Sequence, residues 1–430
     1  MKTSTKVPVV KVLSSFFTIL ILGLGTSCSD EITKQVEPEI ITEKNDLSAA
    51  LEIADEFFAQ IDPSTRGVSR TAASIQKLNT PSTRSGGDEI DVRLINYADN
   101  QGFALMDVRP GLETIYAISP EGQLSFSDTV SNPVLKEFFD GVGEYEPQIT
   151  LLPVIPIEYK KSYIIKEHCI NKLNEWAEAW DELPNNNEIY FSGTRSWAGT
   201  AAIAVAKIMS FYKYPSKFYL PDVGGDYIIS WDNFLNTEDK IVKYLLVAYL
   251  GWHEVYLNSK YKVFYTETDP SNIGNTFRNM TYSMPGCNGE LLSKKVDFVK
   301  SILREGYGVY KRGPVIAHST QTKDQITTAK NQYWIIDGFV DREYYLVNAS
   351  GNIFNPTTPY KAPTLLHCVW GDGKSPNGYY ALIMGTSNLE NSTQEHIISP
   401  NNKNIQSFKE TGDTIAYTFK DLRIYGGWYF

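Results

Sequence analysis

The stretch WAGTAAIAVAKIMSFYKYP, residues 197–215, predicts a helix that begins just after Gly199 and ends before Pro215. Its five alanines place small side chains around nearly the whole cylinder, with larger apolar residues among them, which is typical of a helix packed on all sides. Thr200 is the first residue of this helix, where free N–H groups and the helix dipole suit a nucleophile or an anion. A hydroxyl that caps the helix explains the same threonine without any catalysis.

Length and composition bound the remaining possibilities. The chain has 430 residues, which is long enough for two globular parts, one of them with a substantial core. It contains 27 Tyr and 20 Phe, which favours strands with broad aromatic faces. The formal net charge is -10 and the sequence has no block of Lys and Arg, so we expect no nucleic-acid partner.

The N-terminus has the pattern of a targeting signal. Lys2, Lys6 and Lys11 precede an apolar run that reaches a small-residue stretch ending at Cys28. The pattern resembles a bacterial lipoprotein signal, which implies that residues 1–27 are removed and that Cys28 carries lipid. An uncleaved membrane anchor is the alternative, but the run is shorter than the roughly 20 apolar residues that span a bilayer. The acidic SDE after the cysteine resembles the export signal of Bacteroides-type surface lipoproteins, so we expect an outer-membrane lipoprotein at the cell surface or on the periplasmic side.

Cysteine spacing argues against a disulfide framework or a zinc site. With Cys28 lipidated, three cysteines remain, and none of them forms a CxxC pair. Cys169, Cys287 and Cys368 are therefore expected to be small buried hydrophobic residues, although each could be a reactive thiol if a base lies nearby. We expect no metal and no cofactor.

A small first domain is predicted over residues 46–150, after a polar tether over 28–45. Residues 47–61 form an amphipathic helix, and the Ser, Thr, Arg and Gly of 62–88 predict a mobile loop. Three or four short strands follow, separated by the turn sequences DNQG, RPG and PEG, which predict an antiparallel meander. Asn132 suits a helix N-cap and Pro133 a first turn, so a second helix closes the domain.

A larger second domain is predicted over residues 151–430. Helices are expected at 160–180 and 197–213, and strands beyond 305, in GPVIAHS, YWIIDGFV and YYLVNAS. Helices that precede a run of strands favour an α+β domain with an antiparallel sheet.

Three stretches together resemble the streptopain family of papain-like cysteine proteases, with an N-terminal propeptide domain of the Spi inhibitor type. The first family stretch, A-G-C-x-A-x-A-x-A-x-I-M with a following Y-P, is matched by Ala198, Gly199, Ala202, Ala204, Ala206, Ile208, Met209, Tyr214 and Pro215. The second, G-H-A-W-V-I-D-G-Y, is matched by Trp334, Ile336, Asp337 and Gly338. The third, H-C-N-W-G-W followed by N-G-Y-Y, is matched by His367, Cys368, Trp370, Gly371, Asn377, Gly378 and Tyr379.

The departures from these stretches fall on the family's catalytic positions. Thr200 stands at the position of the nucleophilic cysteine, Gln332 at that of the base and Val369 at that of the orienting amide. Glutamine cannot cycle a proton near neutral pH, and valine neither donates nor accepts a hydrogen bond. The family also has a glutamine that stabilises the oxyanion formed during peptide cleavage. The corresponding sequence here, WDELPNN, has Asp181 and Glu182 instead, and their charges would repel a developing anion.

The resemblance therefore implies a papain-like fold whose catalytic site is lost. One interpretation is a binding module that captures a peptide, a protein or its own first domain, in a cleft walled by Trp334, Trp370 and the C-terminal YGGWYF. The alternative is an active cysteine-type endopeptidase with a non-standard site built from Cys368, His318 or His367. The two interpretations differ in one distance, because an active thiol and its base must lie within hydrogen-bond reach.

Overall fold

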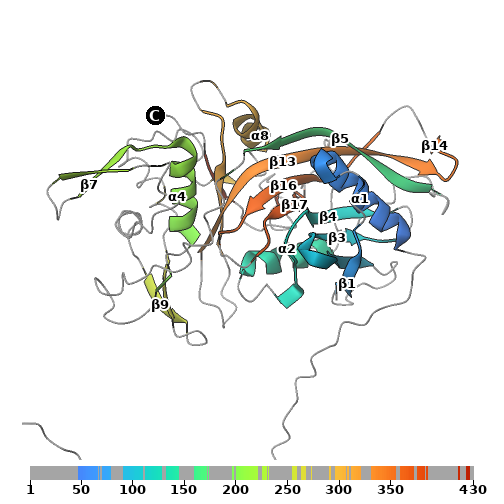
Figure 1. The fold of residues 1–430 in the computed structure, drawn as a ribbon, viewed down its shortest axis with the longest axis horizontal. Helices are drawn as coiled ribbons and strands as arrows, with labels where there is room; N and C mark the ends of the chain where they lie inside the picture. Colours follow the sequence, from blue (N-terminus) through green and yellow to red (C-terminus); the bar gives the residue numbers. More distant parts are fainter. Residues whose placement is uncertain are drawn as a thin grey trace, which may run out of the picture. The chain divides into compact units, whose positions relative to one another are not determined.

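The computed structural model has one large antiparallel sheet with a few helices packed against it (Figure 1). It describes residues in the ranges 47–65, 67, 70–78, 91–109, 112–127, 132–144, 159–171, 173, 196–197, 200–220, 225–229, 231, 254–258, 263–267, 273, 290–291, 296–306, 308, 311–320, 331–354, 359–371, 375–382, 384–385, 415–416 and 423–426. The signal, Cys28 and the tether lie outside these residues. Within the described part, no helix is both long and apolar enough to cross a membrane.

The first helix and the meander form as the sequence predicts. Helix α1 spans Ser48–Ile61 and buries five side chains on one face: Ala50, Ile53, Ala54, Phe57 and Phe58. Strands β2 (Val92–Tyr97), β3 (Phe103–Asp107) and β4 (Thr114–Ser119) pair in antiparallel order. Every residue of the three strands is buried, so both faces of this part of the sheet are covered.

One prediction for this region was wrong. Residues 62–88 were expected to be a mobile loop, but they contain the short 3-10 helix η1 (Pro63–Thr65) and strand β1 (Ala72–Lys77). Strand β1 pairs with β2 at the edge of the sheet, and its side chains are exposed or half-buried. An edge strand with polar residues has little hydrophobic signal, because it obtains its stability from ladder hydrogen bonds rather than from burial.

Helix α2 (Pro133–Glu144) begins at the predicted cap. The Asn132 side chain accepts a hydrogen bond from the Val134 N–H at 3.1 Å, and Pro133 occupies the first turn, where its missing N–H costs nothing. A second 3-10 turn, η2 (Ala98–Asn100), joins β2 to β3.

The predicted helix at 160–180 is contradicted over the residues that the structure describes. Residues Tyr159–Ile170 form strand β5, which pairs along its whole length with β13 (Asn331–Asn348). Burial alternates along Lys161–Cys169, but the more buried face includes the polar Lys161 and Glu167 and the other face includes the exposed Ile164, so the apolar residues offered no clear period of two. Strand β13 also joins the two strands that were predicted separately in YWIIDGFV and YYLVNAS. Its register with β5 shifts between Asp341 and Arg342, but the strand continues through both residues.

The strands form one 13-stranded sheet that contains both predicted domains. Its order is β1-β2-β3-β4-β17-β16-β13-β12-β20-β11, and β5, β14 and β15 also pair with β13. The bounds of its remaining strands are β17 Gly378–Leu382, β16 Thr364–Val369, β12 Val315–Thr320, β20 Arg423–Tyr425, β11 Glu290–Leu291, β14 Ile353–Phe354 and β15 Tyr360–Lys361.

Smaller elements complete the described structure. Helix α4 (Thr200–Tyr212) confirms the predicted helix, and α8 (Val296–Arg304) buries Val299, Ile302 and Leu303. Three smaller sheets contain, respectively, β6 (Ser196–Trp197), β10 (Val263–Glu267) and β9 (Glu254–Asn258); β7 (Lys217–Leu220) and β8 (Gly225–Ile228); and β18 (Met384–Gly385) and β19 (Ile415–Ala416).

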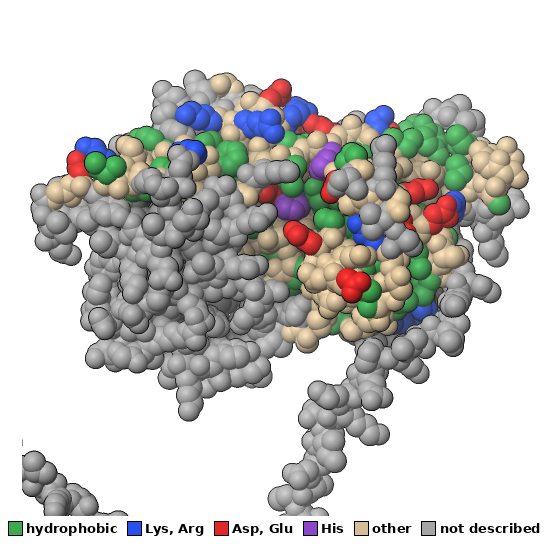
Figure 2. All heavy atoms as spheres, in the orientation of Figure 1, with side chains coloured by type: hydrophobic (Ala, Val, Ile, Leu, Met, Phe, Trp, Pro, Cys, Tyr) green, Lys and Arg blue, Asp and Glu red, His purple; other side chains and the backbone are tan. Residues whose placement is uncertain are grey.

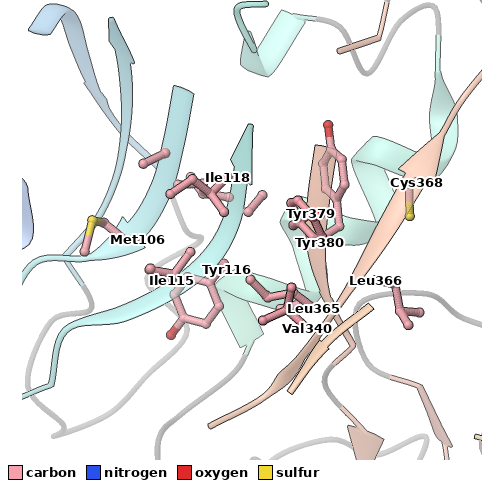
Figure 3. Close-up of a cluster of buried hydrophobic side chains, with 14 of the residues drawn as sticks. Met106, Ile115, Tyr116, Ile118, Val340, Leu365, Leu366, Cys368, Tyr379 and Tyr380 are labelled. Atoms are coloured by element: carbon pink, nitrogen blue, oxygen red, sulfur yellow. The ribbon is translucent and has the colours of Figure 1, made fainter. Parts of the chain in front are cut away.

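The junction between the two predicted domains is the pairing of β4 with β17. Tyr379 is opposite Ile118 and Tyr380 is opposite Ala117. A side chain at Gly378 would place its Cβ 2.8 Å from Ser119 Cβ and 2.9 Å from the Ile118 carbonyl oxygen, so this close approach requires glycine. Figure 3 shows apolar side chains from both sides of the junction in one cluster.

Two helices from the N-terminal part hold β17 between them. Successive residues of a strand point to opposite faces of the sheet. The Phe57 ring of α1 contacts Tyr379, with 6.2 Å between centroids, and the Phe138 ring of α2 contacts Tyr380 at 5.2 Å. Helices α1 and α2 therefore cover opposite faces of the sheet at β17.

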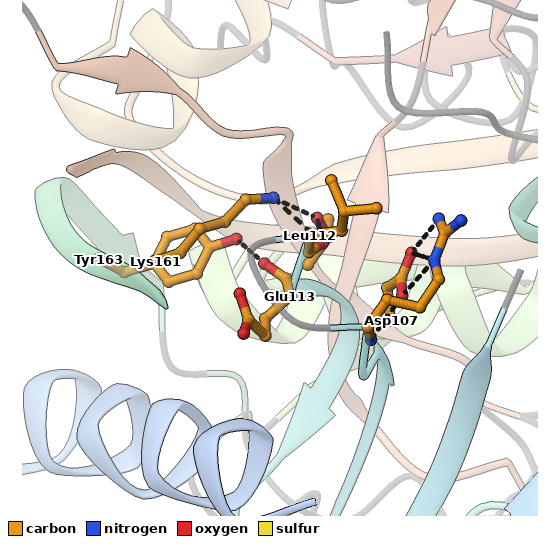
Figure 4. A network of polar contacts seen from close by, with 7 residues as sticks. Asp107, Leu112, Glu113, Lys161 and Tyr163 are labelled. Carbon is orange, nitrogen blue, oxygen red and sulfur yellow. Dashed lines mark hydrogen bonds and ion pairs between the residues drawn. The ribbon is translucent and has the colours of Figure 1, made fainter. Parts of the chain in front are cut away.

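A buried polar network also links the N-terminal part to β5 (Figure 4). The Lys161 ammonium donates to the Leu112 carbonyl at 3.1 Å and to the Thr114 hydroxyl at 3.0 Å, and the Tyr163 hydroxyl donates to the Glu113 carbonyl at 2.6 Å. Desolvation by burial lowers the pKa of Lys161 to about 8. The segment that leads into β4 is thus held by hydrogen bonds from side chains that lie 47 to 50 positions further along the chain.

We predict that Phe138→Ala lowers the unfolding free energy by about 3–5 kcal/mol, because it removes a fully buried ring at the junction. All eight tryptophans lie beyond residue 150, so their fluorescence reports only on the second predicted domain. If the two parts share one core, Phe138→Ala should lower the midpoint of urea unfolding that tryptophan fluorescence reports. An unchanged tryptophan midpoint would show that the two parts unfold separately.

We also predict that the wild-type chain gains stability between pH 8 and pH 10 relative to Lys161→Met. The folded state has a Lys161 pKa of about 8, below the ordinary 10.5, so the unfolded chain binds more protons in this window and stability rises with pH. The stability that neutral Lys161 contributes is lost as pH falls through about 8. Urea denaturation of both proteins across this range measures the difference. Parallel pH profiles would mean that Lys161 is not desolvated.

Candidate functional site

Thr200 lies at the start of α4 against strand β13. Its hydroxyl oxygen accepts a hydrogen bond from the Tyr333 backbone N–H at 3.1 Å. The threonine therefore joins the helix N-terminus to the strand, instead of only capping its own helix as one interpretation of the sequence proposed. Because Tyr333 follows Gln332 directly in β13, this hydrogen bond places Thr200 beside the backbone of Gln332.

Gln332 sits opposite Ser319 in the antiparallel pair of β12 and β13. Opposite residues in such a pair share one face of the sheet, with Cβ atoms about 4.5–5.5 Å apart. Gln332 is 4% exposed and Ser319 is fully buried. The Gln332 amide nitrogen has no hydrogen-bond partner within the part of the chain that the structure describes.

Helix α2 brings an acidic side chain to this pair. The Ser319 hydroxyl donates to the Glu137 carboxylate at 3.2 Å, across 182 positions in the sequence. The start of the same helix is held by the Asn132 amide, which donates to the Ser375 hydroxyl at 3.1 Å. The N-terminal part of the chain therefore makes a polar contact with β12, the strand paired with the one that carries Gln332, and the sequence alone did not reveal this contact.

Val369 is not placed beside Gln332. The register of β16 and β13 sets Val369 opposite Ile335, three positions along the strand from Gln332, which is about 10 Å at the usual rise per residue. Three positions also put Gln332 on the other face from Ile335 and Val369. An amide at position 369 could not orient a base at position 332 in this register.

The two tryptophans predicted to line a cleft are core residues. Trp334 is 1% exposed, Trp370 is fully buried, and their rings pack at 5.5 Å between centroids. Trp370 also packs edge-on against Tyr380, which α2 covers. The prediction that they form the walls of an open cleft is wrong, because both rings are buried, Trp334 against Trp370 and Trp370 against Tyr380.

The cysteines and histidines named for a non-standard site do not form one. Cys368 and His367 are consecutive in β16, so they point to opposite faces. Cys368 is opposite Ile336 and His318 is opposite Tyr333, three positions apart on β13, so this pair is also divided between the faces. Desolvation by burial raises the pKa of the Cys368 thiol, which keeps it protonated.

His318 has a packing role. It is fully buried and packs against Tyr333 in a tilted arrangement, with 4.7 Å between ring centroids and 33° between ring planes. The other described thiol, Cys169, is also buried and donates to the Leu303 carbonyl at 3.2 Å. The prediction that these cysteines are small buried hydrophobic residues is confirmed for Cys169 and Cys368.

A second cluster of titratable groups lies away from Thr200. Asp337 accepts from the His367 ring at 2.5 Å, and His168 shares a hydrogen bond of 2.8 Å with the Tyr379 hydroxyl. His367 also packs edge-on against Tyr379. Desolvation and the neighbouring His367 lower the pKa of His168. Figure 2 shows two neighbouring histidine side chains exposed on one face of the molecule.

This cluster explains why several residues of the third family stretch occur together. His367, Gly378 and Tyr379 hold β16, β17 and β13 in register, with buried Asp337 as the acceptor for the imidazole. Among the described residues there is no group of three or more His, Cys, Asp or Glu that could hold a metal ion. Cys287, Asp181 and Glu182 lie outside the described residues.

Comparisons with known proteins give distant similarity to solved structures. No family model matches the sequence, and no curated protein sequence matches it. Among solved structures, the chain is similar to a mutant fragment of prointerpain A from Prevotella intermedia, with a TM-score of 0.43 and 15% sequence identity. The similarity covers 84% of this chain and 99% of that fragment.

We predict that Thr200→Val destabilises the chain by about 1–3 kcal/mol, because it leaves the Tyr333 N–H without its acceptor. Thr200→Ser keeps the hydroxyl and should retain most of that stability. The unfolding free energies from urea denaturation test both changes. If valine were tolerated as well as serine, Thr200 would not be a structural link between α4 and β13.

Proposed function

We propose that this chain is a streptopain-family cysteine peptidase homologue without peptidase activity, which acts as a lipid-anchored module that binds a peptide or a protein. The observation that carries the proposal is the hydrogen bond from the Tyr333 N–H to the Thr200 hydroxyl, beside Gln332. At the two positions where the family places a thiolate and an imidazole, this chain has a hydroxyl engaged with the backbone and an amide.

Neither group supports the chemistry of peptide cleavage. A hydroxyl nucleophile needs an adjacent base, and known threonine nucleophiles use a free amine that an internal residue lacks. The Gln332 amide has no proton to cycle near neutral pH. The Thr200 oxygen also already accepts the Tyr333 N–H, which reduces its electron density for attack.

The proposed partner over the site is the chain's own N-terminal part. The Glu137 contact with Ser319 holds α2 beside the strand pair that contains Gln332, and the Phe138 contact with Tyr380 and the Asn132 contact with Ser375 hold the same helix against β17 and the segment before it. Family propeptides are removed by the protease itself or by a relative, whereas a chain with this site would not cut itself. We propose that α2 stays in place until a ligand displaces it.

Anchoring completes the proposal. Lipid on Cys28 would attach the chain to the outer membrane, at the cell surface or on the periplasmic side, and the tether over 28–45 would separate the folded part from the bilayer. The negative formal charge supports a peptide or protein ligand rather than a nucleic acid.

The alternative function is an active cysteine-type endopeptidase with a non-standard site. It requires a thiol within about 2.6–3.2 Å of a base, directly or through small movements. Cys368 is fully buried and divided by the sheet from both His318 and His367, so the described residues favour the binding module.

We predict that the purified mature chain cleaves neither casein nor a mixture of denatured proteins, and that a thiol-directed active-site probe does not label it. Thr200→Cys should stay inactive and unlabelled, because a thiol at that position still lacks an imidazole partner. An intact family protease is the positive control. Proteolysis by the wild-type chain, abolished by Cys368→Ala, would establish the alternative.

A further inference from the structure

We infer that Ser319 and Gln332 form a carboxylate-binding site, that Glu137 of α2 occupies it through the hydrogen bond from Ser319, and that an acidic side chain on an amphipathic helix is the feature this site selects. The inference rests on the proposed function, because it names the chemistry by which the site would bind. It concerns α2 docking, so its test does not depend on whether the chain cleaves peptides.

The two strand residues offer donors on the same face of the sheet. Ser319 is opposite Gln332 in the β12–β13 register, and the hydroxyl of Ser319 already donates to the Glu137 carboxylate at 3.2 Å. Gln332 lies beside this contact with a buried amide nitrogen that has no partner among the described residues. A buried amide donor without a partner is costly, so a second acceptor lone pair close to Ser319 is strongly favoured.

A carboxylate is the side chain that fits both donors. Its two oxygens provide about four acceptor positions, enough for the Gln332 NH2 and the Ser319 hydroxyl together, and they carry no donor. Bonds from neutral donors to an ionised acceptor are also the stronger kind. An imidazole at position 332 would change its charge with pH, whereas the Gln332 amide is a neutral donor at all pH values.

The helix that presents Glu137 supplies the rest of the specificity. Val134, Leu135 and Phe138 of α2 are fully buried, whereas Lys136 and Asp140 are exposed and paired with each other. Glu137 sits half-buried at the border between these apolar and polar faces. An external ligand that replaced α2 would need the same arrangement, an apolar helical face with an acidic residue at its border.

The test is a double-mutant cycle that exchanges the amide at position 332 and the carboxylate at position 137. Hydrogen exchange of the α2 amides in the full mature chain measures the effect of each change. Gln332→Glu places a second carboxylate against Glu137, so α2 amides should exchange about tenfold faster or more at pH 7. Adding Glu137→Gln restores an amide facing a carboxylate and should return exchange close to the wild-type rate. At pH 5 the loss in Gln332→Glu should shrink, because one member of a close carboxylate pair takes up a proton.

Asn352→Asp is the matched control, because it adds one negative charge at an exposed position in the β13–β14 turn. It should leave α2 exchange unchanged. The inference is overturned if Gln332→Glu raises the exchange rate of α2 by the same factor in the wild-type chain and in the Glu137→Gln variant. Equal factors would mean that the two residues do not interact, because the effects of independent residues are additive. It is also overturned if Gln332→Glu leaves α2 exchange at the wild-type rate.

Discussion

The pairing of β4 with β17 is the constraint on which the rest of the structure depends. It joins a meander that the sequence presents as a separate domain to the strands of the larger part, and so makes a single sheet. The backbones approach so closely here that position 378 has no room for a side chain. Once the strands are joined, Tyr379 and Tyr380 must project to opposite faces, and helices α1 and α2 cover those faces.

The position of the candidate site follows from this constraint. Because α2 is fixed against Tyr380, its Glu137 reaches Ser319 on β12, next to Gln332. The same packing places Trp370 and Trp334 in the interior. The candidate site is therefore a covered polar contact. The buried donors of Lys161 and Tyr163 hold the other end of the meander, where the backbone enters β4.

The sequence predicted the elements whose signals are local. The alanine-rich α4, the Asn132 cap of α2 and the turns of the meander all depend on residues within a few positions of one another. It failed for β5, taken as a helix, and for β1, taken as a loop, because both strands are stabilised mainly by pairing with distant partners. No local pattern specifies such pairing.

The candidate site divides in the same way. The sequence placed Thr200 at a helix start and, through the resemblance, beside Gln332, and the contact with Tyr333 agrees with this. It could not find Glu137 or Ser319, since their contact spans 182 positions and neither lies in a motif. It assigned Val369 to the site because spacing within a motif does not reveal the strand register that separates it from Gln332.

The most direct test of the shared sheet is to produce residues 151–430 without residues 1–150 and to measure their unfolding. We expect that this part alone has no cooperative thermal transition, because β17 lacks its partner β4 and Tyr380 lacks the rings that cover it. Adding residues 46–150 as a separate chain should restore the transition. A cooperative transition for residues 151–430 alone, at the midpoint of the full chain, would contradict the account.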